Sequence, residues 1–463
     1  MTLHGNTQSA RSARPQLTLI QPPILSPTYP KVPFSFEPLS LLALASMTPP
    51  DAYSVRIIDA ASARDITPAI DLNSSLVGIT VVNVAAPAAY KIAGVYREHG
   101  IPVILGGPHI TLNPDDAAPH ADCVVVGEVE GGWHEILADF ANGKLKSRYE
   151  FEPPDPIRIR VDRSFIPGYR RRYPFISAIQ TTRGCPNGCE FCAASACYGT
   201  TPRHRPVEDV VDEIRNVRDT WRRRTFGFTD DNIVGDTAYA RELFRALIPL
   251  KIKWASQMCL DIAKDEELLD LAVRSGCFAA FVGLESVSEE TLRGIAKPCS
   301  VAEYPGLIEA MHGRGILLIA SFIIGYDGDD EDVYEQTLAF CRENRIEFPL
   351  FVPLMVEPGL PVYERLQREN RLVGQGERDG LPDIGFEPKK LDPATMPSKI
   401  LEMYRKHYTW RAAAAQLPGC FRRGGFRKLV YLLASRFYFG RYIRDIGKAF
   451  HLPSCTQTQE PNR

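Results

Sequence analysis

Two long stretches of the sequence repeat one pattern, in which a short apolar run precedes a segment with helical periodicity. In the first stretch, residues 17–144, the apolar runs lie at 17–23, 54–60, 76–83, 102–107 and 123–128. Strands rich in Val and Ile that alternate with helices are typical of a parallel sheet buried on both faces. The first stretch therefore predicts a doubly wound parallel sheet, whose ligand would lie beyond the carboxyl ends of its strands.

The second stretch, residues 175–355, contains six such units. Their apolar runs lie at 175–181, 225–230, 253–258, 278–285, 317–325 and 348–354. Six consecutive units predict a curved parallel sheet, an incomplete version of the eight-fold barrel, with its chemistry on the loops that follow the strands. The fold class is therefore α/β: a flavodoxin-like sheet, then a partial (β/α)6 barrel, then a helical C-terminal region.

The remaining segments complete the expected domain organisation. Residues 1–16 lack the apolar core of a secretory signal and are expected to be a disordered tail. Residues 145–174 are rich in Pro and Arg and predict a linker. The alternation stops near residue 356, so residues 356–463 predict helices. The net charge of -2 over 463 residues gives no reason to expect a nucleic acid partner.

The sequence contains 11 cysteines, an odd number that argues for a reducing cytoplasm and against a disulfide framework. Three of them, Cys185, Cys189 and Cys192, form a C-x3-C-x2-C cluster directly after the first strand of the second stretch. A structural zinc site needs four ligands, and no second C-x2-C lies nearby. Cys197 is close enough to be a fourth ligand, although C-x4-C is not a usual zinc half-site. The spacing favours an iron–sulfur site over zinc and over inert buried thiols.

Glycine and carboxylate residues gather at strand ends of the first stretch. They occur in LGGPHIT and VVVGEVEGGW, where paired glycines allow a bulky ligand to approach the backbone. The alternative is that these glycines only form tight strand-to-helix turns. The dinucleotide fingerprint G-x-G-x-x-G does not follow the first strand, so a nicotinamide cofactor is disfavoured.

The motif C-x3-C-x-aromatic-C, with Phe191 before the last cysteine, resembles the radical S-adenosylmethionine (SAM) superfamily. The resemblance implies a [4Fe-4S] cluster on the three cysteines and an open iron that binds SAM, whose cleavage yields a 5′-deoxyadenosyl radical. The preceding five-strand domain resembles the subfamily with an N-terminal cobalamin-binding domain. The similarity covers roughly residues 17–390 and includes FTDDNIVGD, VGLESVSEETL, FIIGYDGDD and EPGLPVYERL. Oxidative cyclases of magnesium protoporphyrin and hopanoid or phosphinate methylases belong to this broad group.

One departure from cobalamin domains concerns the cobalt ligand. The motif D-x-H-x-x-G is replaced by QPPILSPTYP after the first strand, so cobalamin is expected without a histidine ligand from this loop. His109 is predicted to be a turn residue. The resemblance implies cofactor-binding roles for Phe191, Asp230, Asp231, Gln257 and Glu285 in the barrel, and for Thr80, Gly106, Gly107, Gly127, Glu128 and Glu130 in the first domain.

Carboxylates suit contacts with the ammonium group and ribose of SAM, because they accept hydrogen bonds strongly. The simpler alternative is that polar residues at strand ends cap the following helices. Asp236 and Ser286 are predicted to be such caps, whereas Asp231 and Glu285 are predicted to be functional.

The expected activity is methyl transfer to an unactivated carbon or phosphorus of a small-molecule or lipid substrate. The alternatives are oxidative cyclisation, rearrangement or C–C coupling with the same cofactors, and a non-catalytic iron–sulfur redox sensor. An electron donor such as flavodoxin or ferredoxin is the implied protein partner. Residues 421–450 contain eight Arg or Lys residues against one acidic residue. This basic segment predicts either peripheral contact with the inner face of the membrane or a helix packed on the barrel.

Overall fold

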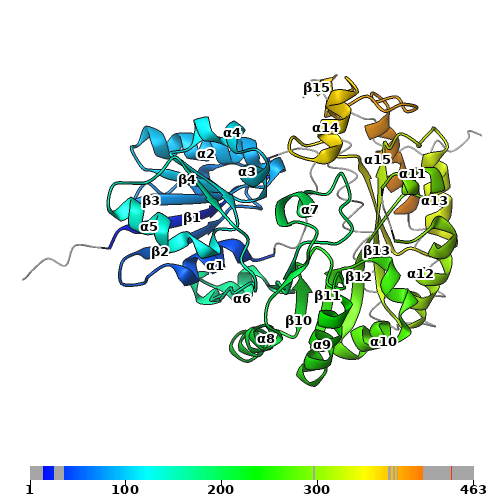
Figure 1. The fold of residues 1–463 in the computed structure, drawn as a ribbon, viewed down its shortest axis with the longest axis horizontal. Coiled ribbons are helices and arrows are strands. Elements are labelled where there is room, and N and C mark those ends of the chain that lie inside the picture. Colours follow the sequence, from blue (N-terminus) through cyan, green and yellow to red (C-terminus); the bar gives the residue numbers. More distant parts are fainter. Residues whose placement is uncertain are drawn as a thin grey trace, which may run out of the picture. The chain divides into compact units, whose positions relative to one another are not determined.

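The computed structural model describes residues 14–25, 36–295, 298–373, 384–409 and 440, and short strands at 377–378 and 381–382. The described chain divides into two compact units. The first contains the N-terminal residues up to 24, residues 38–152 and residues 160–169. The second contains residues 36–37, 153–159 and the chain from residue 170 onward. Figure 1 shows the helices and strands of both units.

The first unit is built on a six-stranded parallel sheet with the strand order β2-β1-β3-β4-β5-β6. The strands are β1 (Gln16–Gln21), β2 (Ser54–Asp59), β3 (Leu76–Thr80), β4 (Val103–Gly106), β5 (Cys123–Gly127) and β6 (Arg148–Phe151). The first five strands lie in the expected runs and have the flavodoxin-like order 2-1-3-4-5. The sixth strand is a difference from the sequence interpretation, because it lies in the expected linker.

Strand β6 forms because charged, exposed residues alternate with an aromatic residue that is buried. Tyr149 is buried and packs with the core of the unit, whereas Arg148 and Glu150 are exposed. The strand pairs in parallel with β5 over four residues at the edge of the sheet. A short run with two charged residues is typical of an edge strand, and its alternation was masked by the surrounding Pro and Arg residues.

Helices cover both faces of this sheet (Figure 1). They are α1 (Leu39–Met47), α2 (Ala86–Glu98), α3 (Pro108–Leu112), α4 (Pro114–Ala117) and α5 (Trp133–Ala141). Side chains of α2, α3 and α4 pack with Val77, Ile79 and Leu105 on one face. Side chains of α1 and α5 pack with Leu17, Leu19 and Ile104 on the other. The two apolar layers confirm the doubly wound sheet.

The second unit contains six parallel strands in the order β14-β13-β12-β11-β10-β7. They are β7 (Ser177–Ile179), β10 (Thr225–Phe228), β11 (Lys253–Gln257), β12 (Cys277–Glu285), β13 (Leu317–Ile324) and β14 (Phe348–Pro353). Each strand lies beside the next along the chain, as in a barrel that does not close. This order confirms the predicted partial barrel.

Helices follow one another along the outer side of this curved sheet (Figure 1). They are α8 (Val207–Trp221), α9 (Thr237–Leu247), α10 (Glu266–Ser275), α12 (Tyr304–Gly313) and α13 (Val333–Glu343), and a short helix α11 (Glu289–Arg293) precedes α12. Their apolar residues recur at helical spacing; in α8 the residues Val207, Val210, Val211, Ile214 and Val217 are all buried. This stripe places the helix on the sheet and its charged residues in solvent.

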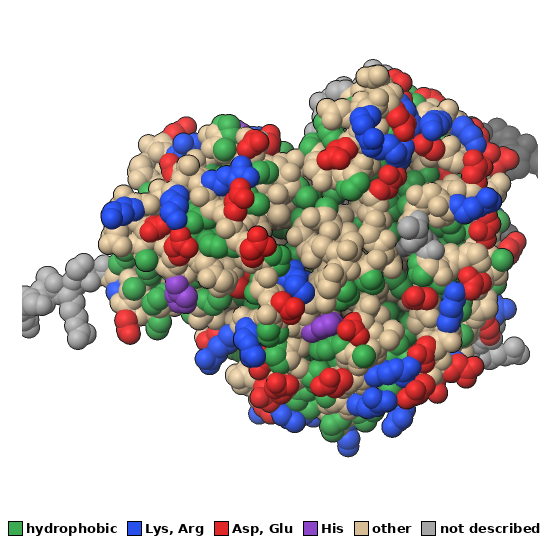
Figure 2. Space-filling model, in the orientation of Figure 1, with side chains coloured by type: hydrophobic (Ala, Val, Ile, Leu, Met, Phe, Trp, Pro, Cys, Tyr) green, Lys and Arg blue, Asp and Glu red, His purple; other side chains and the backbone are tan. Residues whose placement is uncertain are grey.

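The described part of the C-terminal region includes α14 (Pro361–Arg368) and α15 (Met396–His407). The Tyr404 hydroxyl on α15 accepts a hydrogen bond at 3.0 Å from the backbone N–H of Phe351 in β14, the edge strand of the barrel sheet. The basic segment at 421–450 lies outside the described residues, apart from residue 440. Among the described helices, none is both long and apolar enough to cross a membrane. Figure 2 shows basic and acidic side chains intermixed over the face in view.

Candidate functional site

The three clustered cysteines lie in one short loop that is closed at its base. Strands β8 (Thr182–Arg183) and β9 (Arg203–His204) pair antiparallel and enclose residues 184–202, including α7 (Ala193–Tyr198). At Gly184, with φ of +90°, a Cβ atom would lie 2.9 Å from the carbonyl oxygen of Thr201. Because the ends of the loop approach so closely, only glycine fits there. The hairpin was not predicted from the sequence.

The thiols of this loop have distinct environments. Cys185 and Cys189 are buried, and Cys192 is partly buried. Burial raises the pKa of the Cys185 thiol, so a thiolate there requires compensating positive charge of the kind that iron supplies. Burial, with the nearby Asp231 and Cys192, raises the pKa of Cys197 to about 12. Burial therefore opposes a thiolate at both positions in the protein alone.

Within the described chain, no three His, Cys, Asp or Glu side chains converge where one metal ion could bind. A four-iron cluster makes a different demand from a single ion. The thiolates of a four-iron cluster each bind a different iron atom, so the donor set of three thiols from one loop fits such a cluster.

Asp230 ties the end of β10 to the chain just before the cysteines. It is 2% exposed, and one carboxylate oxygen accepts the backbone N–H groups of Thr181 at 2.6 Å and Thr182 at 2.8 Å. The Thr181 hydroxyl donates to the other oxygen at 2.6 Å. Burial raises the pKa of Asp230 to about 6. Both oxygens are thus occupied by the chain itself, so the contacts of Asp230 are those of a positioning residue.

A second set of hydrogen bonds fixes the segment between the first two cysteines. The side-chain amide of Asn187 donates to Cys259 Sγ at 2.9 Å, and that of Asn232 donates to the same sulfur at 3.3 Å. The side-chain oxygen of Asn232 accepts a hydrogen bond from the backbone N–H of Cys259 at 3.2 Å. Cys259 lies outside the cysteine cluster and was not predicted to be a site residue. Its place just after β11 was the signal that could have indicated a role at this edge of the sheet.

Asp231 and Glu285 also lie at this edge. The Asp231 carboxylate accepts the backbone N–H of Gly184 at 3.3 Å, next to Cys185. Glu285 is buried and has φ of +66°, an unusual value for a residue with a side chain. The register between β12 and β13 shifts between Gly283 and Glu285, and such irregularities redirect side chains near functional sites. Gln257 ends β11 at the same edge but is exposed.

Tyr326 was not identified from the sequence, although it lies in the quoted FIIGYDGDD. Its ring packs edge-on against Phe191, with centroids 5.9 Å apart. The side chain is 5% exposed, yet its hydroxyl has no hydrogen-bond partner in the described structure. Burial, followed by the charges of Glu285 and Cys189, raises the pKa of Tyr326 far above its usual value. A buried donor without a partner fits a site that a polar ligand completes.

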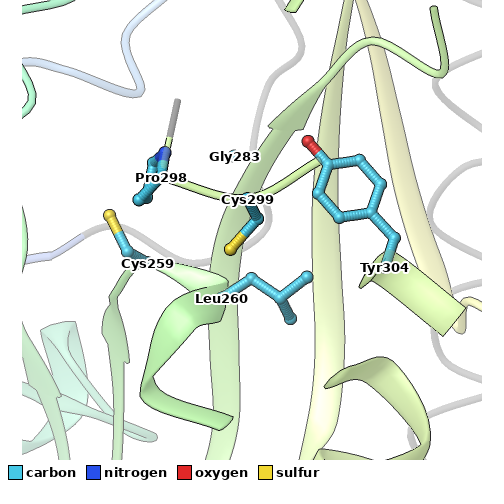
Figure 3. A pocket seen from close by; sticks show the side chains of 6 residues that line it. All are labelled: Cys259, Leu260, Gly283, Pro298, Cys299 and Tyr304. Atoms are coloured by element: carbon cyan, nitrogen blue, oxygen red, sulfur yellow. The ribbon is translucent and has the colours of Figure 1, made fainter. Parts of the chain in front are cut away.

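A small pocket opens beside the ends of β11 and β12 (Figure 3). It is lined by Cys259, Leu260, Gly283, Pro298, Cys299 and Tyr304. Tyr304 on α12 donates a hydrogen bond to the carbonyl of Leu284 at 2.8 Å, which closes one wall of the pocket.

The two residues predicted to cap helices, Asp236 and Ser286, differ in the groups that they bind. Asp236 caps α9 by accepting from Ala238 and Tyr239, whereas the Ser286 hydroxyl accepts from the N–H of Ser288, the residue that caps α11.

The strand ends of the first unit carry the remaining predicted residues. Gly107 and Gly127 have φ of +104° and +86°. A Cβ at Gly127 would lie 2.5 Å from the carbonyl oxygen of Phe151, and one at Gly107 would lie 2.9 Å from the backbone nitrogen of Val81. The chain itself therefore requires glycine at both positions. At Gly106 a Cβ would meet only Val125 at 3.8 Å, so the fold leaves that position open.

The other predicted residues of this unit have varied surroundings. Thr80 ends β3 and Glu128 follows β5; Thr80 is partly buried, and Glu128 is buried. Glu130 is partly buried in the turn before α5. His109 is buried in the short helix α3, where its Nε2 lies 2.9 Å from the Tyr90 hydroxyl. His109 therefore packs at the start of a helix, close to the turn where it was expected.

Comparisons with known proteins agree with this division of the chain. A family model described as the radical SAM superfamily matches residues 179–341, and one described as a B12 binding domain matches residues 29–137. The bacteriochlorophyllide d C-12(1)-methyltransferase of Chlorobaculum tepidum is 29% identical over 422 residues, which are 90% of each chain. The hopanoid C-2 methylase of Rhodopseudomonas palustris is 27% identical over 75% of this chain and 67% of its own.

Solved structures show the same fold. The radical SAM methyltransferase TsrM from Kitasatospora setae, with tryptophan and a SAM analogue bound, superposes with a TM-score of 0.66 at 16% identity. The match covers 88% of this chain and 90% of TsrM. The cobalamin-dependent SAM radical enzyme OxsB superposes with a TM-score of 0.67 at 14% identity, over 93% of this chain and 72% of its own.

Proposed function

Because the chain combines a radical SAM domain with a B12-binding domain, we propose that it is a cobalamin-dependent radical SAM methyltransferase. Its target is an unactivated carbon of a small-molecule or lipid substrate. The observation that carries the proposal is the closed loop of three thiols at the carboxyl ends of a six-stranded parallel sheet, in a chain that matches a carbon methyltransferase over 90% of both lengths.

When bound, the [4Fe-4S] cluster, SAM and cobalamin supply the electron transfer, the radical and the methyl group that such chemistry needs. The protein supplies position and the exclusion of water. In this proposal Cys185, Cys189 and Cys192 hold the cluster, and Asp230 keeps the base of their loop in place. Asp231, Glu285 and Phe191 contact SAM, with Gln257 at the exposed rim of the same edge.

For cobalamin, the proposed contacts lie at the carboxyl ends of β3, β4 and β5. Gly106 is the position where the fold itself leaves space, so it fits a backbone that a flat ligand approaches. Thr80, Glu128 and Glu130 are proposed as polar contacts at the neighbouring strand ends. Gly107 and Gly127 shape the turns between them.

Carbon is proposed over phosphorus as the methyl acceptor because relatives that match most of this chain are named as carbon methyltransferases. The C-12(1)- and C-8(2)-methyltransferases of bacteriochlorophyllide d match 90% and 81% of this chain. A small-molecule extract from a strain that lacks the gene, incubated anaerobically with methyl-labelled SAM and a reductant, tests the reaction. Methyl transfer yields S-adenosylhomocysteine together with 5′-deoxyadenosine and a labelled product. Formation of 5′-deoxyadenosine alone would favour cyclisation or coupling, and a reduced protein that never cleaves SAM would favour a redox sensor.

The partners are proposed from the cofactors and the charge pattern. Flavodoxin or ferredoxin is the proposed electron donor to the cluster, in the cytoplasm. The basic segment at 421–450 is proposed to contact the anionic inner face of the membrane, which would bring the enzyme to a lipid-soluble substrate. Sedimentation of the full chain with anionic but not neutral vesicles tests this contact, and equal recovery with both would refute it.

A further inference from the structure

Helix α14 engages the residue between two cluster cysteines, although it lies outside the barrel strands. Glu190 lies between Cys189 and Phe191 in the sequence. Two guanidinium nitrogens of Arg365 in α14 each donate a hydrogen bond to one oxygen of the Glu190 carboxylate. Arg365 Nη2 lies 2.8 Å from Oε1, and Nε lies 3.1 Å from Oε2. The backbone N–H of Val362, at the start of α14, donates to the Glu190 carbonyl at 3.1 Å. One helix thus holds both the backbone and the side chain of this residue.

The same guanidinium reaches the loop after β13. Arg365 Nη1 lies 3.1 Å from the carboxylate of Asp327, which also pairs with Arg371 at 2.8 Å and Lys389 at 3.0 Å. Asp327 directly follows Tyr326, whose ring packs on Phe191. Arg365 therefore bridges two loop carboxylates, each next to one member of the aromatic pair beside the cysteines. It also lies 3.5 Å from the carboxylate of Glu369, four positions along the chain.

This contact differs from an ordinary surface ion pair, which contributes little to stability. The Arg365 and Glu190 side chains are only 27% and 26% exposed, and the fork geometry provides two parallel charge-assisted hydrogen bonds. A lysine, with a single ammonium group, cannot bind Glu190 twice and Asp327 at the same time. Partners that orient a metal ligand commonly change metal affinity about 10–100-fold when they are removed.

We propose that Arg365 is a positioning residue through which the C-terminal extension holds the cluster loop, so that retention of the cluster depends on α14. Glu190 transmits the contact to Cys189 and Phe191 on either side. The proposal rests on the iron–sulfur assignment made under Proposed function, and it adds residues beyond the cysteine motif to the machinery that keeps the cluster in place.

The experiment compares Arg365→Met with Arg368→Met on the same helix. Arg368 is exposed, and its Nε donates a hydrogen bond to the Glu364 carbonyl of α14 at 3.3 Å. After anaerobic reconstitution, iron content and the rate of iron loss to a chelator are measured on the full chain. Arg365→Met is expected to lose iron about 10-fold faster than the wild type, whereas Arg368→Met should match the wild type. Equal rates for all three would overturn the proposal.

A double-mutant cycle distinguishes loss of the Arg365–Glu190 contact from a general folding defect. If Arg365 acts through Glu190, then Glu190→Gln and the double variant should lose iron as fast as Arg365→Met, without a further increase. Additive effects would overturn the proposal. So would equal loss of helical circular dichroism and iron in Arg365→Met, because Arg365 would then stabilise the whole fold. A wild type that never binds iron would instead overturn the cluster assignment itself, and this proposal with it.

Discussion

The carboxyl ends of the two parallel sheets look alike in the sequence, but their residues have different causes. In the first unit the backbone requires the glycines, whereas in the second unit the polar residues and thiols fit a bound ligand. In the first unit, Gly107 and Gly127 follow strand ends, and the neighbouring backbone leaves no room for a Cβ at either. In the second unit, the strand ends carry buried polar side chains and the three thiols of the C-x3-C-x2-C cluster. The fold alone explains the two glycines. It does not explain the cysteines, or the Tyr326 hydroxyl that has no partner among the described residues.

The two units therefore give evidence of different strength for a bound ligand. A glycine with positive φ satisfies the needs of its own turn, so it adds little support for a cofactor. A buried polar group without a partner costs free energy in the protein alone, so it points to something that is bound. The cluster site is therefore supported by its own chemistry. The cobalamin site depends on the position of Gly106 and on the family match.

The largest effect should come from the cysteines. Cys185→Ala, Cys189→Ala and Cys192→Ala should each abolish activity, because a cluster held by two thiolates would be lost or misplaced. Cys197→Ala should keep its cluster, because Cys197 lies outside the C-x3-C-x2-C spacing. The measurement is iron content and visible iron–sulfur absorption. Loss of the cluster in Cys197→Ala with retention in Cys189→Ala would contradict the assignment.

Asp230→Ala should have the next largest effect. It removes the acceptor of three donors, and each donor left without a partner costs about 1–3 kcal/mol, so a loss of about 3 kcal/mol or more is expected. Chemical denaturation measures the change in unfolding free energy, and iron content measures the cluster. Full stability with weakened SAM binding would mean that Asp230 contacts the cofactor directly, as the sequence interpretation had it.

The two kinds of glycine can be separated in the first unit. Gly127→Ala should destabilise this unit by about 1 kcal/mol or more, because positive φ and a close carbonyl oppose any side chain. Gly106→Val should lower cobalamin content while iron is retained, since its Cβ meets no close atom in the fold. Absorbance and iron analysis on the same anaerobic sample measure both. Equal loss of cobalamin and iron in Gly106→Val would indicate misfolding, and a wild type that never retains cobalamin would remove the cofactor assignment.

Tyr326→Phe should weaken SAM binding about 5-fold, which corresponds to about 1 kcal/mol for one hydrogen bond. It should also stabilise the ligand-free protein slightly, because it removes a buried hydroxyl that has no partner among the described residues. Equilibrium binding of SAM and chemical denaturation measure the two changes. Lower stability with unchanged SAM affinity would show that the hydroxyl has a structural partner instead.

The smallest effect is expected at a helix cap. Asp236→Ala removes the acceptor for the N–H groups of Ala238 and Tyr239, and should lower the unfolding free energy by about 1 kcal/mol. Iron and cobalamin contents should not change. A selective loss of SAM binding would move Asp236 from the capping residues to the functional ones.

The sequence by itself determined the first five strands of the first sheet, all six strands of the barrel and the cysteine spacing. Strand runs such as 317–325 and 348–354 match β13 and β14 within about one residue, because a short continuous run of apolar residues is a local signal. The C-x3-C-x2-C spacing is equally local, since all its members lie in one loop.

Only the tertiary structure decided which distant residues meet around that loop. Asn187 and Cys259 are 72 positions apart, and Glu190 and Arg365 are 175 positions apart. Local periodicity records whether a side chain faces the core, but it does not record which partner the side chain finds there. Strand β6 is held at the sheet edge by its pairing with β5, and the Tyr326 ring is placed beside Phe191 by the fold of the second unit. No single segment specifies these contacts. Each one joins two strand ends or loops that are distant in the sequence, and the sheet as a whole places them side by side.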